Sequence, residues 1–173
     1  MRIPELQHQL TESHRQFIRT IQNVADADFA KSVNNKWTAG QQLEHIIKSV
    51  SPVNITFALP GFMLKMMFGR ANRPSRTYDQ LVEKYHAKLN QGGRAPGRFV
   101  PASIHVSQRA VLIKKLEHVT RSLSKRIEDF SEEQLDLLLL PHPLLGKLTL
   151  REMIYFTIYH AGHHEKQVIE NLK

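Results

Sequence analysis

Positions suited to burial recur every three or four residues along four stretches of the chain, which is the spacing of one face of an α-helix. The first stretch follows Pro4, and the fourth lies near the C-terminal end. The positions are Leu6, Leu10, Phe17, Ile21 and Val24; Ala39, Leu43, Ile46 and Val50; Leu112, Leu116, Val119, Leu123, Ile127 and Phe130; and Thr157, Ala161, His164 and Val168. The pattern predicts four long amphipathic helices.

Capping signals indicate where two of these helices begin. Thr38 followed by Gln41, and Thr149 followed by Glu152, have the form of a capping box, in which each side chain binds a free backbone amide of the first turn. We therefore expect the second helix to begin at Thr38 and the last to run from Thr149 to about Asn171. Because proline has no backbone N–H, Pro52 is expected to end or kink the second helix.

The connecting segments give weaker signals. We expect a polar loop at Asp26–Asp28, short helical pieces at Ile55–Phe68, Tyr78–Leu89 and Ser131–Leu135, and a third long helix from about Ser107 to Phe130. The glycine-rich run Asn90–Arg98 is expected to be the most flexible part. Prolines on both sides of His142 favour an extended or turned path, and the chain shows no strand pattern of any length.

These elements predict an all-α protein in which residues 1–173 form a single domain, a four-helix bundle with a long, partly helical crossover between the second and third helices. We define the crossover as residues 59–101. The interior of such a bundle is a usual place for a metal site.

Composition excludes several classes of protein. The chain has no cysteine, so disulfides, thiolate zinc sites and a cysteine nucleophile are excluded. The missing cysteines and a polar N-terminus without the apolar core of a signal peptide favour the cytoplasm. The most apolar run, Val53–Phe68, is interrupted by Pro60 and Lys65 and is too short to cross a bilayer. Its Met63, Met66, Met67 and Phe68 are expected in the core or in a lid over a site, rather than in a membrane anchor.

The net charge of +8 is concentrated in the middle of the chain. Between Lys65 and Arg126 there are 14 lysines and arginines against three acidic residues. Such a surface attracts nucleic acid, an anionic membrane or an anionic small substrate, or is simply solvated. Since no nucleic-acid-binding motif accompanies the charge, nucleic acid is the disfavoured partner.

Two histidines in the last predicted helix provide the first candidate chemistry. His160 and His164 are four residues apart, which places both imidazoles on one helical face, where they can bind one divalent metal. His163 is a competing partner at a spacing of three residues. Ala161 stands where zinc proteases carry a glutamate, so that mechanism is disfavoured. The alternative is that these are ordinary buried or surface histidines.

A metal centre with open positions needs a third ligand. Seven histidines lie outside this segment, namely His8, His14, His45, His86, His105, His118 and His142. His45 stands out because it lies inside the second helix beside Ile46, on the apolar side. An isolated histidine in such a place can also be an ordinary core residue.

Three short segments in register resemble the DinB-like superfamily. They are Trp37-Thr38 followed by Gln41-Gln42-Leu43-Glu44-His45, then His142-Pro143-Leu144-Leu145-Gly146, and finally His160 through Gln167. The resemblance spans nearly the whole chain. It differs at Glu165-Lys166, where an arginine-glycine pair is common, and in the crossover, which matches no known part of the family.

The resemblance implies a bundle of up-down-down-up topology that binds one divalent metal, zinc or nickel, through His45, His160 and His164. It also implies a homodimer. Gln41, Gln167, His163, Trp37 and His142 are the residues expected to support the metal ligands or line a pocket, although Trp37 is also the kind of residue that packs the end of a bundle.

Characterised relatives include thiol transferases and a mycothiol-dependent isomerase. We therefore expect transfer of a low-molecular-weight thiol to an electrophilic small molecule. Arginines of the crossover, Arg70, Arg73, Arg76, Arg94 and Arg98, are candidates to bind the carboxylates of the cosubstrate. The alternatives are a non-catalytic, stress-associated metal-binding protein and a metal-dependent hydrolase.

Overall fold

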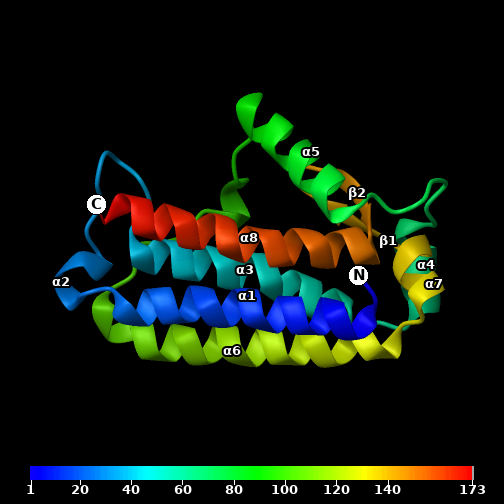
Figure 1. Ribbon diagram of the computed structural model, residues 1–173, viewed down its shortest axis with the longest axis horizontal. Helices are drawn as coiled ribbons and strands as arrows, with labels where there is room; N and C mark the ends of the chain where they lie inside the picture. The colour runs from blue at the N-terminus through cyan, green and yellow to red at the C-terminus, as the bar shows by residue number, and fades with distance from the viewer. Residues whose placement is uncertain (173) are drawn as a thin grey trace.

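A computed structural model describes residues 1–172 and shows four long helices packed side by side (Figure 1). They are α1 (Ile3–Asn23), α3 (Ala39–Thr56), α6 (Arg109–Arg126) and α8 (Leu150–Asn171). α1 and α8 run in one direction and α3 and α6 in the other, so the order along the chain is up, down, down, up. The predicted all-α four-helix bundle is confirmed.

The predicted apolar faces meet inside the bundle and form one continuous core. The pattern is wrong by one position at the start of α6, where Ile113 is buried and Leu112 is only partly covered. Most of α8 is buried along its first half, because the crossover and a hairpin cover the side that the bundle leaves open. Among residues 1–172, no single helix is both long enough and apolar enough to cross a membrane.

Both predicted capping boxes are present as hydrogen bonds. The Thr38 hydroxyl accepts from the Gln41 amide, and the Gln41 side chain accepts from the Thr38 amide. Thr149 and Glu152 make the same exchange at the start of α8. Of the two outcomes expected at Pro52, an end to the second helix is excluded, because α3 continues to Thr56. Pro52 itself is exposed, and the burial of Val53 and Phe57 holds the last turn in place.

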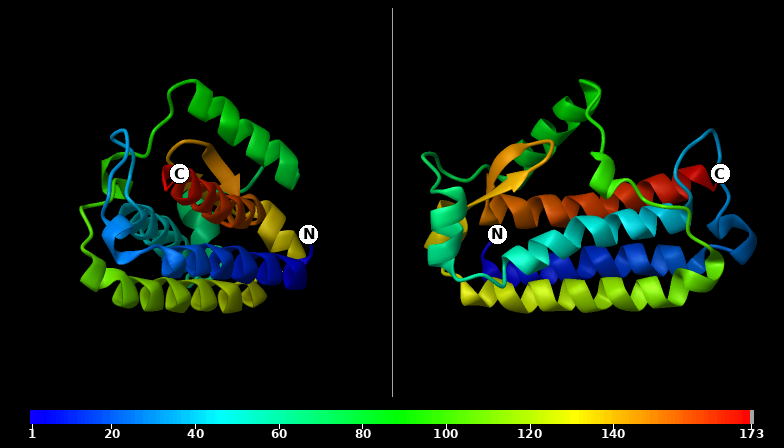
Figure 2. Two further views of the ribbon diagram at one scale, coloured as in Figure 1. Left: turned by 60° about the vertical axis from the view of Figure 1, so that its left-hand side comes forward. Right: turned by 180° about the vertical axis from the view of Figure 1, so that it is seen from behind.

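The crossover contains α4 (Gly61–Phe68), α5 (Tyr78–Asn90) and the short 3-10 turn η1 (Gly97–Phe99), and the turn η2 (Val106–Gln108) follows it before α6. The helical piece expected at Ile55–Phe68 is split, because the chain turns by 109° between α3 and α4. α5 lies across α8 on the outside of the bundle (Figure 2). The crossover therefore covers the face on which α3 and α8 meet.

A small hairpin between α6 and α8 was not expected. It consists of β1 (Leu139–His142) and β2 (Gly146–Thr149), which pair antiparallel. Each strand has only four residues and β1 contains Pro141, so neither shows the alternation that predicts a strand. The expected loop at Asp26–Asp28 is likewise a single turn of helix, α2 (Asp26–Phe29). The remaining pieces are η3 (Ile127–Asp129) and α7 (Glu132–Leu137).

Candidate metal centre

His160 and His164 lie one turn apart on α8 and face the inside of the bundle. They are only 6% and 4% exposed, respectively. Thr157, Ala161 and Val168 continue the same buried face, as the spacing predicted. The two imidazoles are therefore held next to one another in the core.

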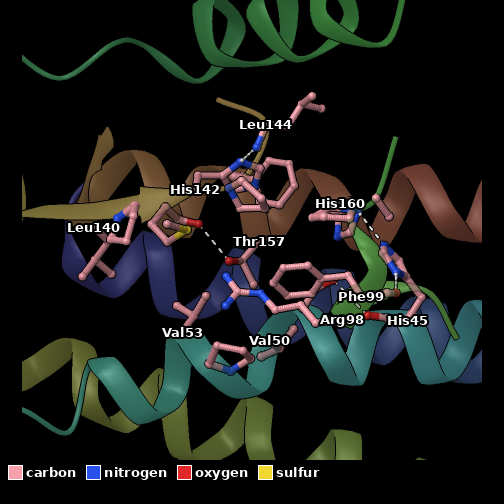
Figure 3. A pocket seen from close by; sticks show the side chains of 18 of the residues that line it. His45, Val50, Val53, Arg98, Phe99, Leu140, His142, Leu144, Thr157 and His160 are labelled. Atoms are coloured by element: carbon pink, nitrogen blue, oxygen red, sulfur yellow. Dashed lines mark hydrogen bonds between the residues drawn. The ribbon is translucent and has the colours of Figure 1, made fainter. Parts of the chain in front are cut away.

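His45 approaches this pair from α3, the antiparallel neighbour of α8 (Figure 3). Gly40 near the start of α3 lets Phe29 and Ile104 pack directly against the helix, since a Cβ at this position would lie 2.8 Å from the Phe29 ring. His45 follows little more than one turn later and is 4% exposed. Three histidines from two helices thus meet in the interior.

The three Nε2 atoms converge on one point. The Nε2 atom of His160 lies 3.3 Å from that of His45 and 2.9 Å from that of His164. Two nitrogen ligands of a tetrahedral zinc site, at the usual Zn–N distance, stand about 3.3 Å apart. The spacing therefore fits a single divalent cation bound by all three imidazoles.

Two of the imidazoles are fixed through their other nitrogen. His45 Nδ1 lies 2.8 Å from the backbone carbonyl of Phe99, which can only accept, so Nδ1 carries the proton. His164 Nδ1 forms a short hydrogen bond with Oε1 of Gln42. Both rings consequently direct the Nε2 lone pair toward the shared point, which is the tautomer that a metal ligand needs.

Burial also keeps the cluster uncharged. It lowers the pKa of His160 and His164 well below the usual value for histidine, and neighbouring imidazoles lower these pKa values further. Burial lowers the pKa of His45 too, although the Phe99 carbonyl partly opposes this shift. Since only a neutral imidazole can bind a metal, the site is prepared for one at neutral pH.

The supporting residues expected from the sequence lie in several places. Trp37 packs beside the cluster, with its ring centroid 4.8 Å from that of His45 and 6.2 Å from that of His164. Gln167 accepts a hydrogen bond from Gln42 at 3.2 Å and donates one to His163 at 3.0 Å. His163 is therefore linked to the cluster through two amides and does not itself face the shared point.

His142 lies in the hairpin, at the end of β1. Its Nδ1 accepts hydrogen bonds from the amides of Leu144 and Leu145, at 3.2 and 3.1 Å. Its ring packs 4.3 Å from that of Phe156, which in turn stacks on His160. Burial lowers the pKa of His142 to about 4, and Lys84 contributes to this. One aromatic ring thus separates His142 from the cluster.

A cavity of about 230 Å³ opens beside His45 and His160 (Figure 3). α3 and α8 form two of its walls, and the hairpin and the end of the crossover form the others. No aspartate or glutamate among residues 1–172 lines it. Its lining is mostly apolar, so it suits an apolar ligand bound beside the histidines.

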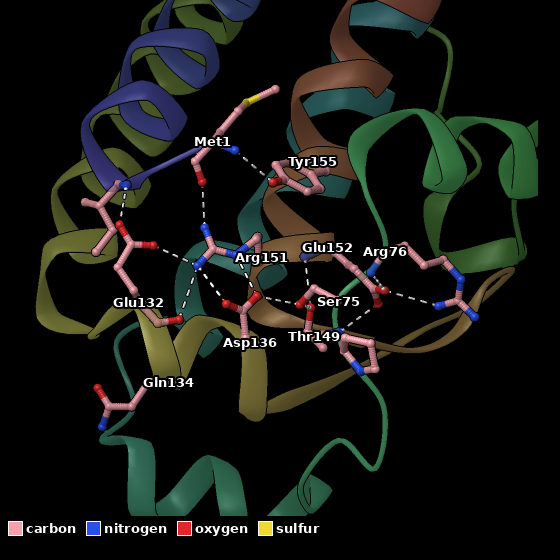
Figure 4. Close-up of polar contacts among 12 residues, drawn as sticks. Met1, Ser75, Arg76, Glu132, Gln134, Asp136, Thr149, Arg151, Glu152 and Tyr155 are labelled. Atoms are coloured by element: carbon pink, nitrogen blue, oxygen red, sulfur yellow. Dashed lines mark hydrogen bonds and ion pairs between the residues drawn. The ribbon is translucent and has the colours of Figure 1, made fainter.

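The five arginines of the crossover divide into three groups. Arg73 binds Glu152 at 2.6 Å. Arg76 binds the same carboxylate at 3.2 Å (Figure 4). The two ion pairs fasten the crossover to the start of α8. They are therefore structural. Arg94 and Arg98 line the cavity, and Arg70 is exposed away from it.

Sequence reasoning missed Gln42 and the carbonyl of Phe99. Gln41 was expected to support the site, but its side chain is used in the capping box with Thr38. That box was visible in the sequence, so the free amide of Gln42, three residues before His45, could have been preferred. No sequence signal marks the Phe99 carbonyl, which comes from 54 residues away.

The remaining histidines lie elsewhere. His14 is buried in α1 and bonds to the Leu10 carbonyl at 2.8 Å. Surface positions are occupied by His8, His86, His105 and His118. Of the ten histidines, only His45, His160 and His164 gather as a group that could hold a metal within the described residues.

Comparison with known proteins places this arrangement in a family. The sequence matches the DinB superfamily over residues 9–168. It is 32% identical over 139 residues to the uncharacterized protein YuaE of Bacillus subtilis (strain 168). The aligned segment covers 80% of this chain and 76% of YuaE. The fold is similar to that of YfiT from Bacillus subtilis, described as a probable metal-dependent hydrolase with an unusual four-helix bundle topology. That similarity has a TM-score of 0.63 and 15% identity, over 97% of this chain and 84% of YfiT. Since the sequence match covers most of the chain and includes all three histidines, the chain belongs to the DinB superfamily.

Proposed function

We propose that this protein is a metal-dependent enzyme that transfers a low-molecular-weight thiol to an electrophilic small molecule. The observation that carries the proposal is the convergence of three buried Nε2 atoms at the wall of an apolar cavity. His45, His160 and His164 would hold one divalent cation. Zinc and nickel are the proposed ions, because both accept imidazole ligands readily.

A divalent cation held by three uncharged ligands supplies positive charge that stabilises the thiolate form of a thiol. The thiol belongs to a cosubstrate, because the chain has no cysteine of its own. The electrophile would bind in the cavity, with its reacting atom toward His160.

The residues of the chain have distinct tasks in this proposal. The Phe99 carbonyl and Gln42 hold two imidazoles with their Nε2 atoms directed at the cation. Apolar side chains such as Val50 and Phe156 exclude water, which would otherwise solvate the thiolate and reduce its reactivity.

Hydrolysis is the second candidate, and the description of YfiT favours it. Hydrolases of the zinc-protease type use a base for the attacking water, a glutamate beside the first histidine. Here Ala161 occupies that position, and no carboxylate among residues 1–172 lines the cavity. A thiol loses its proton far more readily than water, so thiol transfer needs no such base.

The test is a panel of thiols, including glutathione, mycothiol and bacillithiol, each supplied with an aryl chloride as electrophile. The expected result is thiol consumption that a chelator abolishes and that zinc or nickel restores. The His45→Ala/His160→Ala variant, assayed in the same way, should be inactive.

Other outcomes select the alternatives. Turnover that a chelator leaves unchanged would contradict the proposal. Chelator-sensitive cleavage of nitrophenyl esters without any thiol would favour hydrolysis. Absence of turnover in protein with bound metal would favour a non-catalytic metal-binding protein.

We also propose that the protein forms a homodimer in the cytoplasm. The family resemblance supports the assembly, and the absence of cysteine is consistent with the compartment. Light scattering of the purified protein should give twice the mass of one chain, and the mass of a single chain would contradict the dimer.

A further inference from the structure

We propose that the cavity beside the three histidines binds a medium-length apolar carboxylate, and that Arg94 and Arg98 bind its carboxylate group. The inference rests on the proposed function in one respect, namely that this ligand is the substrate of the metal centre. Binding of the ligand itself requires only the cavity and the two arginines.

The walls of the cavity favour an apolar ligand. Its lining includes Val50 and Val53 from α3, Leu140 and Leu144 from the hairpin, and Leu89 from the crossover. Phe156 of α8 packs between His142 and His160. Burying a hydrocarbon chain against these side chains is favourable, because it removes apolar surface from water.

Three of the four hydroxyl groups in the lining, all but that of Tyr85, are already used. Ser49 donates to the carbonyl of His45, Thr56 to that of Pro52, and Thr157 to that of Met153, at 2.8–2.9 Å. Each of these bonds lies within a helix. These three hydroxyls therefore add little polarity to the cavity.

The size of the cavity indicates the length of the ligand. A volume of about 230 Å³ is many times the roughly 10–15 Å³ of such space that one water molecule needs, so the cavity accommodates a chain of several carbon atoms. We take a chain of about eight carbon atoms as the probe. A chain half as long would leave much of the wall exposed to water.

The charge of the lining favours an anion. Arg94 and Arg98 are the only fully charged residues that line the cavity, and neither forms an ion pair within the described residues. Both arginines are exposed, and the Arg98 guanidinium lies 4.8 Å from the centre of the Phe99 ring. Arg73 and Arg76, by contrast, are neutralised by Glu152.

His142 adds a second reason to expect an acceptor on the ligand. Because its Nδ1 accepts two backbone amides, the neutral ring must carry its proton on Nε2. The ring lines the cavity, and no residue in the described part of the chain binds this N–H. The arginines and His142 are all donors, so the polar atoms of a matching ligand are acceptors, as in a carboxylate.

The test is calorimetric titration of the protein with octanoate, octan-1-ol, octylammonium and butyrate. Octanoate should bind at least tenfold more tightly than octanol, because a charge-assisted bond to arginine is lost in the alcohol. It should also bind more than tenfold more tightly than butyrate, which buries fewer methylenes. Octylammonium should not bind. Octanoate affinity no greater than that of octanol or octylammonium would overturn the proposal.

Arginine variants test the assignment of the carboxylate. Arg94→Gln/Arg98→Gln should weaken octanoate binding at least tenfold and leave octanol binding unchanged. Arg70→Gln, an exposed crossover arginine outside the cavity, is the matched control and should bind octanoate as the unmodified protein does. Equal octanoate affinity in the double arginine variant and the unmodified protein would overturn the assignment.

Metal-free protein and the His45→Ala/His160→Ala variant separate this proposal from the proposed function. Both should still bind octanoate, since the arginines do not depend on the cation. If octanoate binds only when metal is present, the carboxylate binds the cation and the arginine site is wrong. Octanoate binding in a protein without thiol transfer or hydrolysis would count against the proposed function alone.

Discussion

At the scale of single residues, the direction of each Nε2 lone pair in the histidine cluster depends on which ring nitrogen is hydrogen-bonded to the protein. Burial makes a charged imidazole costly, so His45 and His164 are neutral and each can donate from only one nitrogen. The Phe99 carbonyl and the Gln42 side chain take that donor. The orientation of the proposed metal ligands therefore follows from two groups that would not touch the metal.

Neighbouring glutamines test this account. Gln42→Leu should weaken binding of zinc or nickel by about 10- to 100-fold, because His164 loses the group that orients it. Gln41→Leu should leave metal affinity unchanged and lower the free energy of unfolding by about 1 kcal/mol, because it breaks the capping box. Metal affinity is measured by competition with a chromophoric chelator, and unfolding in urea. Equal metal affinity in Gln42→Leu and the unmodified protein would refute the role of Gln42.

The sequence predicted much of the cluster because helix geometry is local. A spacing of four residues is enough to place His160 and His164 on one face, and the apolar neighbours of His45 indicate that it faces inward. The sequence could not predict the hydrogen bond from His45 to the Phe99 carbonyl, because every residue carries a backbone carbonyl. Its position depends on the path of the whole crossover.

At the scale of elements, the predictions succeeded where a strong periodic pattern coincides with a cap. α3 and α8 begin where Thr38 and Thr149 predicted. The hairpin was missed because its strands are short and gain their stability from pairing with each other and from packing on α8, which no local pattern records. Glu152 shows how one residue can serve two elements, since it caps α8 and also binds two arginines of the crossover.

Two helical glycines offer a matched pair of substitutions. Gly40→Ala should lower the free energy of unfolding by about 1–3 kcal/mol, because the added methyl would lie 2.8 Å from Phe29 and 3.0 Å from Ile104. Gly162→Ala should raise it by about 0.5–1 kcal/mol, because alanine loses less backbone freedom and nothing lies within 4 Å. Urea unfolding measures both. A stabilised Gly40→Ala protein would show that the contact between α2 and α3 is looser than described.

At the scale of the whole molecule, the basic crossover is the part that the sequence described least well. Its charge alone left open whether it attracts an anionic partner or is simply solvated, and folding divides its arginines between different tasks. Arg73 and Arg76 form ion pairs with Glu152 that attach the crossover to α8. Arg151 of the bundle binds Glu132 and Asp136 nearby (Figure 4). Only Arg94 and Arg98 are left beside the cavity. That division depends on which acids lie close in space, which the order of residues along the chain does not reveal.

Buried histidines should make the stability of the bundle depend on pH. Burial lowers the pKa of His14 to about 4, against 6.5 when unfolded, so the unfolded chain binds a proton that the folded chain does not. Stability from this group is complete above pH 6.5 and is lost as the pH falls toward 4. The loss has a slope of about 1.4 kcal/mol per pH unit and a total of about 3 kcal/mol.

His14→Gln removes this dependence. In metal-free protein, the free energy of unfolding of the variant should fall less steeply between about pH 6.5 and 4.5 than that of the unmodified protein. The difference between the two slopes should correspond to the uptake of about one proton on unfolding. Urea titrations at several pH values measure both slopes. Parallel curves would contradict the assignment to His14.

If His45, His160 and His164 together hold one divalent metal ion, elemental analysis of the purified protein should find about one zinc or nickel ion per chain, as a single three-histidine site requires. None should be found in the His45→Ala/His160→Ala variant. The His8→Ala/His118→Ala variant, which changes two exposed histidines, should keep the full amount. Retention of the full amount by a folded His45→Ala/His160→Ala protein would show that these histidines do not hold the metal.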